Sequence, residues 1–316
     1  MIVDAHCHLS ADLGPAGLLR VLDRSGVDRA VILPEAAEPP VSRLGQPPRG
    51  GTGCPEGALP RVSVKLLLST LGPLARFQYA SLVQGGMVRC GDGWRRIQSR
   101  PDNSPVAEVV AGDPDRFIGL AFVNPRDPGH LDVLDRCFAQ GFRGIKVHAW
   151  LHDVDLRRDL HKAAERCGDA GFPVMVHLGG TYRTGLSILD LADRLPTTAF
   201  IVTHAGLPYY STLWQATRTH PNLYFDLSGP FMSAELVRLT AKHVPPGRLL
   251  FASGGPSYLR RADGELDYSE VMGWVDSLGL GREPRRAVFG DNLLRLVGLG
   301  RARGRPAAAS ESRGGR

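Results

Sequence analysis

Short apolar runs recur along this chain at a regular interval, and their spacing limits the folds that it can adopt. Most runs begin 24–30 residues after the previous one, and amphipathic helical patterns fill most of the gaps. Strands that alternate with helices indicate a parallel sheet, and eight such units close into a (β/α)8 TIM barrel of the α/β class. The eight predicted strands are Ile2–Ala5, Ala30–Leu33, Phe117–Val123, Gly144–His148, Pro173–His177, Ala199–His204, Leu223–Leu227 and Leu249–Ser253.

One interval breaks this spacing. An insertion of nearly seventy residues, from Pro34 to about Asn103, follows the second run, and its first part is rich in Pro and Gly. A loop that follows a barrel strand leaves at the carboxyl face, where the active sites of this fold lie. The insertion at about 35–102 is therefore predicted to form a lid, and the alternative is a surface loop with no role. Residues 1–299 are assigned to a single barrel.

The positive charge is concentrated at the carboxyl end. The formal net charge is +6, and residues 300–316 contribute five arginines and one glutamate, a net charge of +4. This basic tail has too few apolar residues to pack, so it is predicted to be disordered. The small charge of the remaining chain does not favour a nucleic-acid partner.

Cysteine usage and the start of the chain indicate the compartment. The five cysteines show no metal-ligand spacing and are odd in number, as expected of free thiols in a reducing environment. The chain opens on a strand rather than on a signal sequence, and no apolar stretch is long enough to cross a bilayer. We expect a cytoplasmic enzyme with a small-molecule substrate and no membrane partner, and a homodimer is left open.

Two predicted strands carry pairs of polar residues at their carboxyl ends. His6 and His8 are two residues apart, so they point to the same face of the first strand, whereas Cys7 points to the other. Lys146 and His148 repeat this spacing on the fourth strand. A His-x-His pair alone is more often a buried polar pair than a metal site.

Two further strands also end in histidine. His177 closes the fifth strand and His204 the sixth, so both are expected at the same end of the barrel as the two pairs. Several neutral imidazoles that face one another bind Zn²⁺, Mn²⁺ or Fe²⁺. Such an ion lowers the pKa of a bound water toward neutrality, and the sequence therefore predicts a metal-dependent enzyme.

Short motifs throughout the chain resemble the amidohydrolase superfamily. The most similar branch is the amidohydrolase-related group that includes aminocarboxymuconate-semialdehyde and resorcylate-type decarboxylases. The resemblance covers most of residues 1–35 and 103–298. The motifs that carry it are Val3–His8, Pro114–Pro125, Gly144–His148, Val176–His177, Thr203–Gly206, Tyr224–Ser228 and Phe289–Asn292.

The resemblance implies one divalent metal ion, with Zn²⁺ as the first expectation. By position, His6, His8 and His177 match the metal-binding histidines of the family. His204 matches the histidine that polarises the substrate or transfers protons beside the metal. Lys146 stands where other branches have a carbamylated lysine that bridges two metals, but this branch does without that role. Lys146 is instead expected, together with His148, to bind the substrate or to support the ligands.

The chain departs from the family after the eighth strand. The family has Gly-Ser-Asp-x-Pro there, and its aspartate contacts the metal and acts as general base. In the corresponding run, Phe251–Pro256, the aspartate is replaced by Gly254, which offers no ligand, base or charge.

Two main hypotheses remain. The first is a metal-dependent hydrolase of an amide, ester or lactone, or a decarboxylase, in which the base is His204 or a carboxylate after the eighth strand: Asp263, Glu265 or Asp267. The second is a degenerate or metal-independent barrel used for binding or for non-hydrolytic chemistry. A regulatory module that works through the insertion and the tail is the weakest alternative. Arg183, after the fifth strand, is the candidate to bind a substrate carboxylate. The alternative is that its side chain is a solvated surface group.

Overall fold

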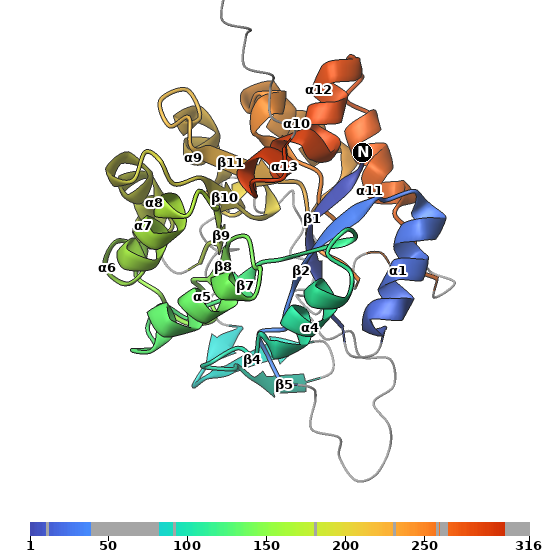
Figure 1. Ribbon diagram of the computed structural model, residues 1–316. Helices are drawn as coiled ribbons and strands as arrows, with labels where there is room; N and C mark the ends of the chain where they lie inside the picture. The colour runs from blue at the N-terminus through green and yellow to red at the C-terminus, as the bar shows by residue number, and fades with distance from the viewer. Residues whose placement is uncertain are drawn as a thin grey trace, which may run out of the picture.

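The structure is a computed structural model that describes residues 1–10, 13–38, 82–90, 93–179, 182–229, 232–256, 259 and 265–300. Helices surround a central set of parallel strands (Figure 1). All eight strands expected from the sequence are present, and the third is divided in two at Leu120. They are β1 (Val3–His8), β2 (Arg29–Leu33), β6 (Phe117–Gly119) with β7 (Ala121–Phe122), β8 (Ile145–His148), β9 (Val174–His177), β10 (Phe200–Val202), β11 (Leu223–Asp226) and β12 (Leu249–Leu250).

The barrel strands pair in two parallel sheets. One has the order β1-β2-β6 and the other the order β12-β11-β10-β9-β8-β7. The sheets meet at Leu120, between β6 and β7, and again between β1 and β12. At this second junction the Ala5 amide donates to the Phe251 carbonyl at 2.9 Å, and the His8 amide donates to the Gly255 carbonyl at 2.8 Å. Irregular backbone hydrogen bonds, rather than a continuous ladder, therefore join the two sheets around the barrel.

Helices cover the outside of the strands. The described helices are α1 (Gly14–Ser25), α4 (Ser104–Gly112), α5 (His130–Ala139), α6 (Leu156–Asp159), α7 (His161–Asp169), α8 (Tyr182–Arg194), α9 (Tyr210–Ala216), α10 (Ala234–His243), α11 (Ser269–Asp276), α12 (Arg282–Arg286) and α13 (Asn292–Leu296), with a π-helical turn, η5 (Ala287–Asp291), that joins the last two. This last helical segment ends the helical layer at the carboxyl end of the described barrel. No helix in the described ranges is long and apolar enough to span a membrane.

The core has two layers because strand side chains alternate between two faces. The layer between the strands and the helices is the larger one and includes Phe225 and Phe251. The layer inside the barrel includes Met175 and Ile201, and leucines of α13 close it at the amino end. Packing on both faces buries the strands completely, which explains why they read as nearly continuous apolar runs.

A register shift in β1 turns the two histidines toward the barrel interior. Val3 and Ala5 belong to the interior core, whereas Cys7 belongs to the layer beneath the helices. The pairing of β1 with β2 shifts between Asp4 and Cys7, as at a β-bulge. The predicted shared face of His6 and His8 is confirmed, since their ring centroids are 5.3 Å apart.

Only the two ends of the insertion fall within the described residues. The second end forms a small antiparallel sheet of β3 (Val83–Gln84), β4 (Met87–Cys90) and β5 (Gly93–Arg96), which lies at the end of the molecule where β2 ends (Figure 1). The first end joins it through an isolated bridge between Ala37 and Ile97. The Gln98 carbonyl contacts His152 Nε2 at 2.9 Å, so the returning segment reaches the loop after β8. The remainder of the predicted lid and residues 301–316 of the predicted disordered tail lie outside the described residues, and both stay predictions.

Candidate active site

The carboxyl ends of the strands bring the predicted site residues into one buried cluster. His6 lies beside His204, with ring centroids 5.6 Å apart. The rings of His177 and His204 are 4.7 Å apart, and His148 stacks on His177 at 3.8 Å. All of these side chains are less than a tenth exposed. The sequence-based grouping of strand ends therefore matches the described geometry, while the roles of the residues remain predictions.

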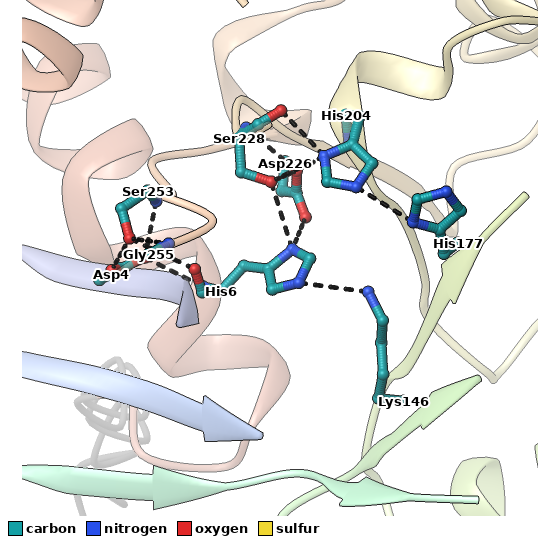
Figure 2. A network of polar contacts seen from close by, with 9 residues as sticks. All are labelled: Asp4, His6, Lys146, His177, His204, Asp226, Ser228, Ser253 and Gly255. Carbon is teal, nitrogen blue, oxygen red and sulfur yellow. Dashed lines mark hydrogen bonds and ion pairs between the residues drawn. The ribbon is translucent and has the colours of Figure 1, made fainter. Parts of the chain in front are cut away.

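Asp226, at the end of β11, is the centre of this cluster, although the sequence analysis gave it no role. Its Oδ2 atom accepts a hydrogen bond from His6 Nδ1 at 2.9 Å, and both side chains are fully buried (Figure 2). Its Oδ1 atom accepts from the His204 amide at 2.8 Å and from Ser228 Oγ at 2.6 Å. Burial alone would raise the pKa of Asp226, but His6 and these hydrogen bonds outweigh burial and hold the pKa below its ordinary value.

The contact with Asp226 fixes the protonation of His6. A carboxylate only accepts hydrogen bonds, so His6 Nδ1 carries the proton and His6 Nε2 carries the lone pair. Burial, and then the positive charge of Lys146, lower the pKa of His6 to about 3. His6 is therefore neutral at physiological pH, which is the form that binds metal ions.

Lys146 contacts the other side of the same ring. It is fully buried on β8, and its Nζ atom lies 3.3 Å from His6 Nε2 (Figure 2). An ammonium group only donates, so Lys146 donates to the lone pair of His6 Nε2. His6 thus bridges a buried cation and a buried anion across the barrel.

His177 is oriented by a second chain of hydrogen bonds. His204 Nδ1 lies 3.0 Å from the Ser228 carbonyl, which only accepts, so this nitrogen carries the proton of His204. In its neutral form His204 then accepts at Nε2 from His177 Nδ1, at 3.1 Å. The lone pair of His177 is therefore on Nε2. In this geometry His204 positions His177, and its part in proton transfer stays a prediction.

The remaining predicted ligand follows the same pattern. His8 Nδ1 donates to the Pro34 carbonyl at 3.2 Å, which places the lone pair of His8 on Nε2. His6, His8 and His177 are thus all held through Nδ1, by a carboxylate, a carbonyl and an imidazole. A carboxylate or a backbone carbonyl is the support that metal-binding histidines usually have, as for His6 and His8.

The chemistry of these three histidines fits a divalent ion, but their placement limits how well they can hold one. Three histidines that are held through Nδ1 are, in their neutral form, a ligand set that Zn²⁺ accepts through Nε2, with a fourth position left for water or substrate. Among the described residues, however, no three His, Cys, Asp or Glu side chains are grouped to hold a metal ion. Lys146 occupies the lone pair of one of the three ligands, and Gly254 provides no carboxylate.

The backbone at His204 adopts an uncommon conformation. His204 and Ala205 open the short turn η2 (His204–Gly206) with φ values of 55° and 54°, in the left-handed region. This region costs a residue other than Gly about 1–2 kcal/mol. The hydrogen bond from the His204 amide to Asp226 stabilises the turn, and Gly229 packs so closely that an added Cβ would overlap the His204 ring.

Asp4 connects β1 to the segment that contains Gly254. Its carboxylate accepts from the Ser253 amide at 2.9 Å and from the Ser253 hydroxyl (Figure 2). It also accepts from Tyr268 Oη at 2.8 Å. Burial raises the pKa of Asp4 to about 6, against the opposing effect of these hydrogen bonds. The Gly254 amide donates to the His6 carbonyl at 2.8 Å, so the backbone at the substituted position lies directly beside the first predicted ligand.

The other candidate residues are not part of the described cluster. Glu265 forms an exposed ion pair with Arg24 at 3.2 Å, and Asp267 accepts from the Ser269 amide at the start of α11. Asp263 and the side chain of Arg183 lie outside the described part of the chain. Of the carboxylates considered as replacement bases, the two that the structure describes have other partners.

Two cavities of about 220 and 330 Å³ lie away from this cluster. Their walls include Phe117, Phe172 and Asn222, which stand at or just before the amino ends of barrel strands. Because this fold places its catalytic groups at the opposite face, neither cavity is a candidate active site.

Comparisons with known proteins agree with this arrangement. The family model described as amidohydrolase matches residues 79–299, and no curated protein matches in sequence. One similar structure is 2,6-dihydroxybenzoate decarboxylase from Rhizobium, with 16% identity, a TM-score of 0.56, and 94% of this chain and 98% of that chain covered. Another is 4-oxalomesaconate hydratase from Rhodopseudomonas palustris, with 17% identity, a TM-score of 0.57, and 95% and 96% covered.

A third similar structure is a probable 2-pyrone-4,6-dicarboxylic acid hydrolase from Acinetobacter baumannii with citric acid bound. It shares 12% identity and a TM-score of 0.58, with 94% of this chain and 99% of that chain covered. Identities of this size show a common fold. The match of the family model over more than half of the sequence confirms the resemblance seen in the motifs, and the chain belongs to the amidohydrolase family.

Proposed function

We propose that this chain is a metal-dependent enzyme that acts on a small carboxylic acid in the mouth of the barrel. His6, His8 and His177 hold one divalent ion, with Zn²⁺ as the first candidate. The observation that carries the proposal is the shared arrangement of these histidines: each contacts a protein partner through Nδ1, so that its neutral ring presents the lone pair at Nε2. Bound there, the ion would supply a Lewis acid that polarises a substrate oxygen or activates a water.

The absence of a carboxylate at Gly254 favours a decarboxylation or another lyase reaction over hydrolysis. Hydrolysis needs a base that takes a proton from the attacking water, and the described carboxylates of the site are committed to structural hydrogen bonds. A decarboxylase needs orientation of the substrate carboxylate and a proton for the product. The names of the similar structures, a dihydroxybenzoate decarboxylase, an oxalomesaconate hydratase and a pyrone-dicarboxylic acid hydrolase, all point to carboxylic acids as substrates.

We assign the chain's own residues to binding and support. Arg183, at the start of α8, is the candidate that binds the substrate carboxylate through paired hydrogen bonds. His148 accepts from the Leu151 amide through Nδ1 at 3.2 Å, so its Nε2 carries a proton and can donate to an oxygen of the substrate. His204 keeps His177 in place and is the candidate for proton transfer.

The test combines metal analysis with activity. The purified protein should contain about one divalent ion per chain, and a His177→Ala variant should not retain it. A strong chelator should abolish turnover on a panel of aromatic and unsaturated carboxylic acids, monitored separately for release of carbon dioxide and for hydrolysis, and added Zn²⁺ should restore it. Turnover that survives complete removal of metal would contradict the proposal.

A second candidate is a metal-independent barrel, which one specific observation favours. Lys146 already places a positive charge against His6 Nε2, and Asp226 neutralises it from the other side of the ring. A protein with no bound ion whose activity does not respond to chelators would support this second candidate.

A further inference from the structure

The contact between Lys146 and His6 involves the same atom that a metal ion would need. Lys146 is fully buried, and its Nζ atom lies 3.3 Å from His6 Nε2 (Figure 2). Asp226 holds the proton of His6 on Nδ1, so Nε2 has one lone pair and no hydrogen. One lone pair cannot accept from an ammonium group and bind an ion at the same time.

The charges around His6 are balanced before any ion arrives. Asp226 and Lys146 stand at opposite sides of one imidazole ring, and all three side chains are fully buried. A buried charge is stable only when it is paired. A divalent ion on His6 Nε2 would take the hydrogen-bond acceptor of Lys146 and would also repel its ammonium group. Gly254, where the family has an aspartate, brings no negative charge to compensate.

We propose that Lys146 is an internal competitor of the metal ion and sets the metal affinity of this site. This inference rests on the proposed function, because it assumes that His6, His8 and His177 are the ligands. In the metal-free protein, the Lys146 ammonium group donates to His6 Nε2 and keeps the ring in place. Binding of the ion requires Lys146 to release this nitrogen, so the affinity is lower than three neutral histidines alone would give.

Zinc affinity of the full-length protein tests the competition. Wild type and a Lys146→Met variant, which keeps an unbranched side chain one atom shorter and without the charge, are stripped of metal and titrated with Zn²⁺ against a chromophoric chelator. We expect Lys146→Met to bind Zn²⁺ roughly tenfold more tightly or better. The control is Lys162→Met, which removes an exposed lysine on α7 and should leave zinc affinity unchanged. Lys146→Gln serves if the Met variant fails to fold.

His177→Ala, made in the wild-type and Lys146→Met backgrounds, separates the two proposals. If it weakens zinc binding in both, but Lys146→Met binds zinc no more tightly than wild type, the ligand assignment stands and the competition is wrong. If it changes zinc binding in neither background, the ligand assignment is wrong and the competition falls with it. As a second measurement, saturating Zn²⁺ should raise the midpoint of thermal unfolding more in Lys146→Met than in wild type.

Discussion

Replacement of Asp226 by Asn should destabilise the protein through the tautomer of His6. The Asn side chain keeps the shape of Asp, but it presents an amide NH₂ group where Asp226 Oδ2 now accepts from His6 Nδ1 at 2.9 Å. His6 must then accept at Nδ1 and carry its proton on Nε2, which faces the donor Nζ of Lys146 at 3.3 Å. The hydrogen bond to the Asp226 carboxylate is replaced by one from a neutral amide, the hydrogen bond from Lys146 is lost, and the buried ammonium group loses both an acceptor and a nearby negative charge.

The size of the expected loss in unfolding free energy follows from these lost interactions. A hydrogen bond to a charged group contributes about 1.5–3 kcal/mol, and removal of one partner of a buried ion pair costs about 3–5 kcal/mol. We therefore expect Asp226→Asn to lower the free energy of unfolding by about 3–5 kcal/mol. Urea denaturation monitored by circular dichroism gives this value from the change in midpoint, provided that the m-value is unchanged.

A second histidine–aspartate pair provides the matched control. Asp193 Oδ1 lies 3.1 Å from His220 Nε2, a distance close to that of the buried pair, but the Asp193 side chain is 70% exposed. Asp193→Asn should therefore cost less than about 1 kcal/mol, because solvent screens the pair and hydrates either partner. A loss for Asp226→Asn as small as that of Asp193→Asn would refute the reasoning, since burial would then add nothing to the pair.

Two further outcomes are expected. Gly229→Ala should lower the free energy of unfolding by about 2 kcal/mol or more, because the new Cβ would overlap the His204 ring at a φ of 109°. The control Gly279→Ala, at a φ of 60° and with open space around the new Cβ, should lower it by only about 1 kcal/mol. Equal unfolding midpoints in the two variants would contradict the role of this close packing. Burial raises the pKa of the three described thiols, Cys7, Cys137 and Cys167, and that of Cys137 reaches about 11. At pH 8 a thiol reagent should therefore leave these three intact and modify at most two of the five cysteines before the protein unfolds.

The fold could be predicted because its strands are buried on both faces. Such strands are short continuous apolar runs, and their regular spacing indicates the helices between them. The histidine cluster could be predicted by the same rule, since the carboxyl ends of parallel strands meet at one face. Asp226 obeys this rule as well, at the end of β11, and could have been found as a polar residue that closes a buried strand.

The contacts within the cluster could not be predicted from strand ends alone. That Lys146 reaches His6 depends on the distance across the barrel between β8 and β1, which no local pattern encodes. The shared face of His6 and His8 follows from alternation, but the bulge before them does not. Strict alternation would have placed Asp4 with the histidines, whereas the register shift sends its carboxylate to Ser253 and Tyr268.

The most specific test of the substituted position is Gly254→Asp compared with Gly254→Asn. Gly254 lies four residues beyond the end of β12, its amide donates to the His6 carbonyl at 2.8 Å, and its φ of 68° lies in the left-handed region. Both variants carry the same backbone cost of about 1–2 kcal/mol, so the difference between them isolates the charge. Beside His6, a carboxylate should both ligate the ion and offset the charge of Lys146, and Gly254→Asp should bind Zn²⁺ about tenfold more tightly than Gly254→Asn.

Turnover of the natural substrate should not rise, because an enzyme adapted to glycine uses the space or the neutrality of this position. Equal zinc affinity in the two variants would show that position 254 lies too far from the ion to matter. Metal-dependent hydrolysis that occurs only in Gly254→Asp would favour a degenerate scaffold over an adapted enzyme.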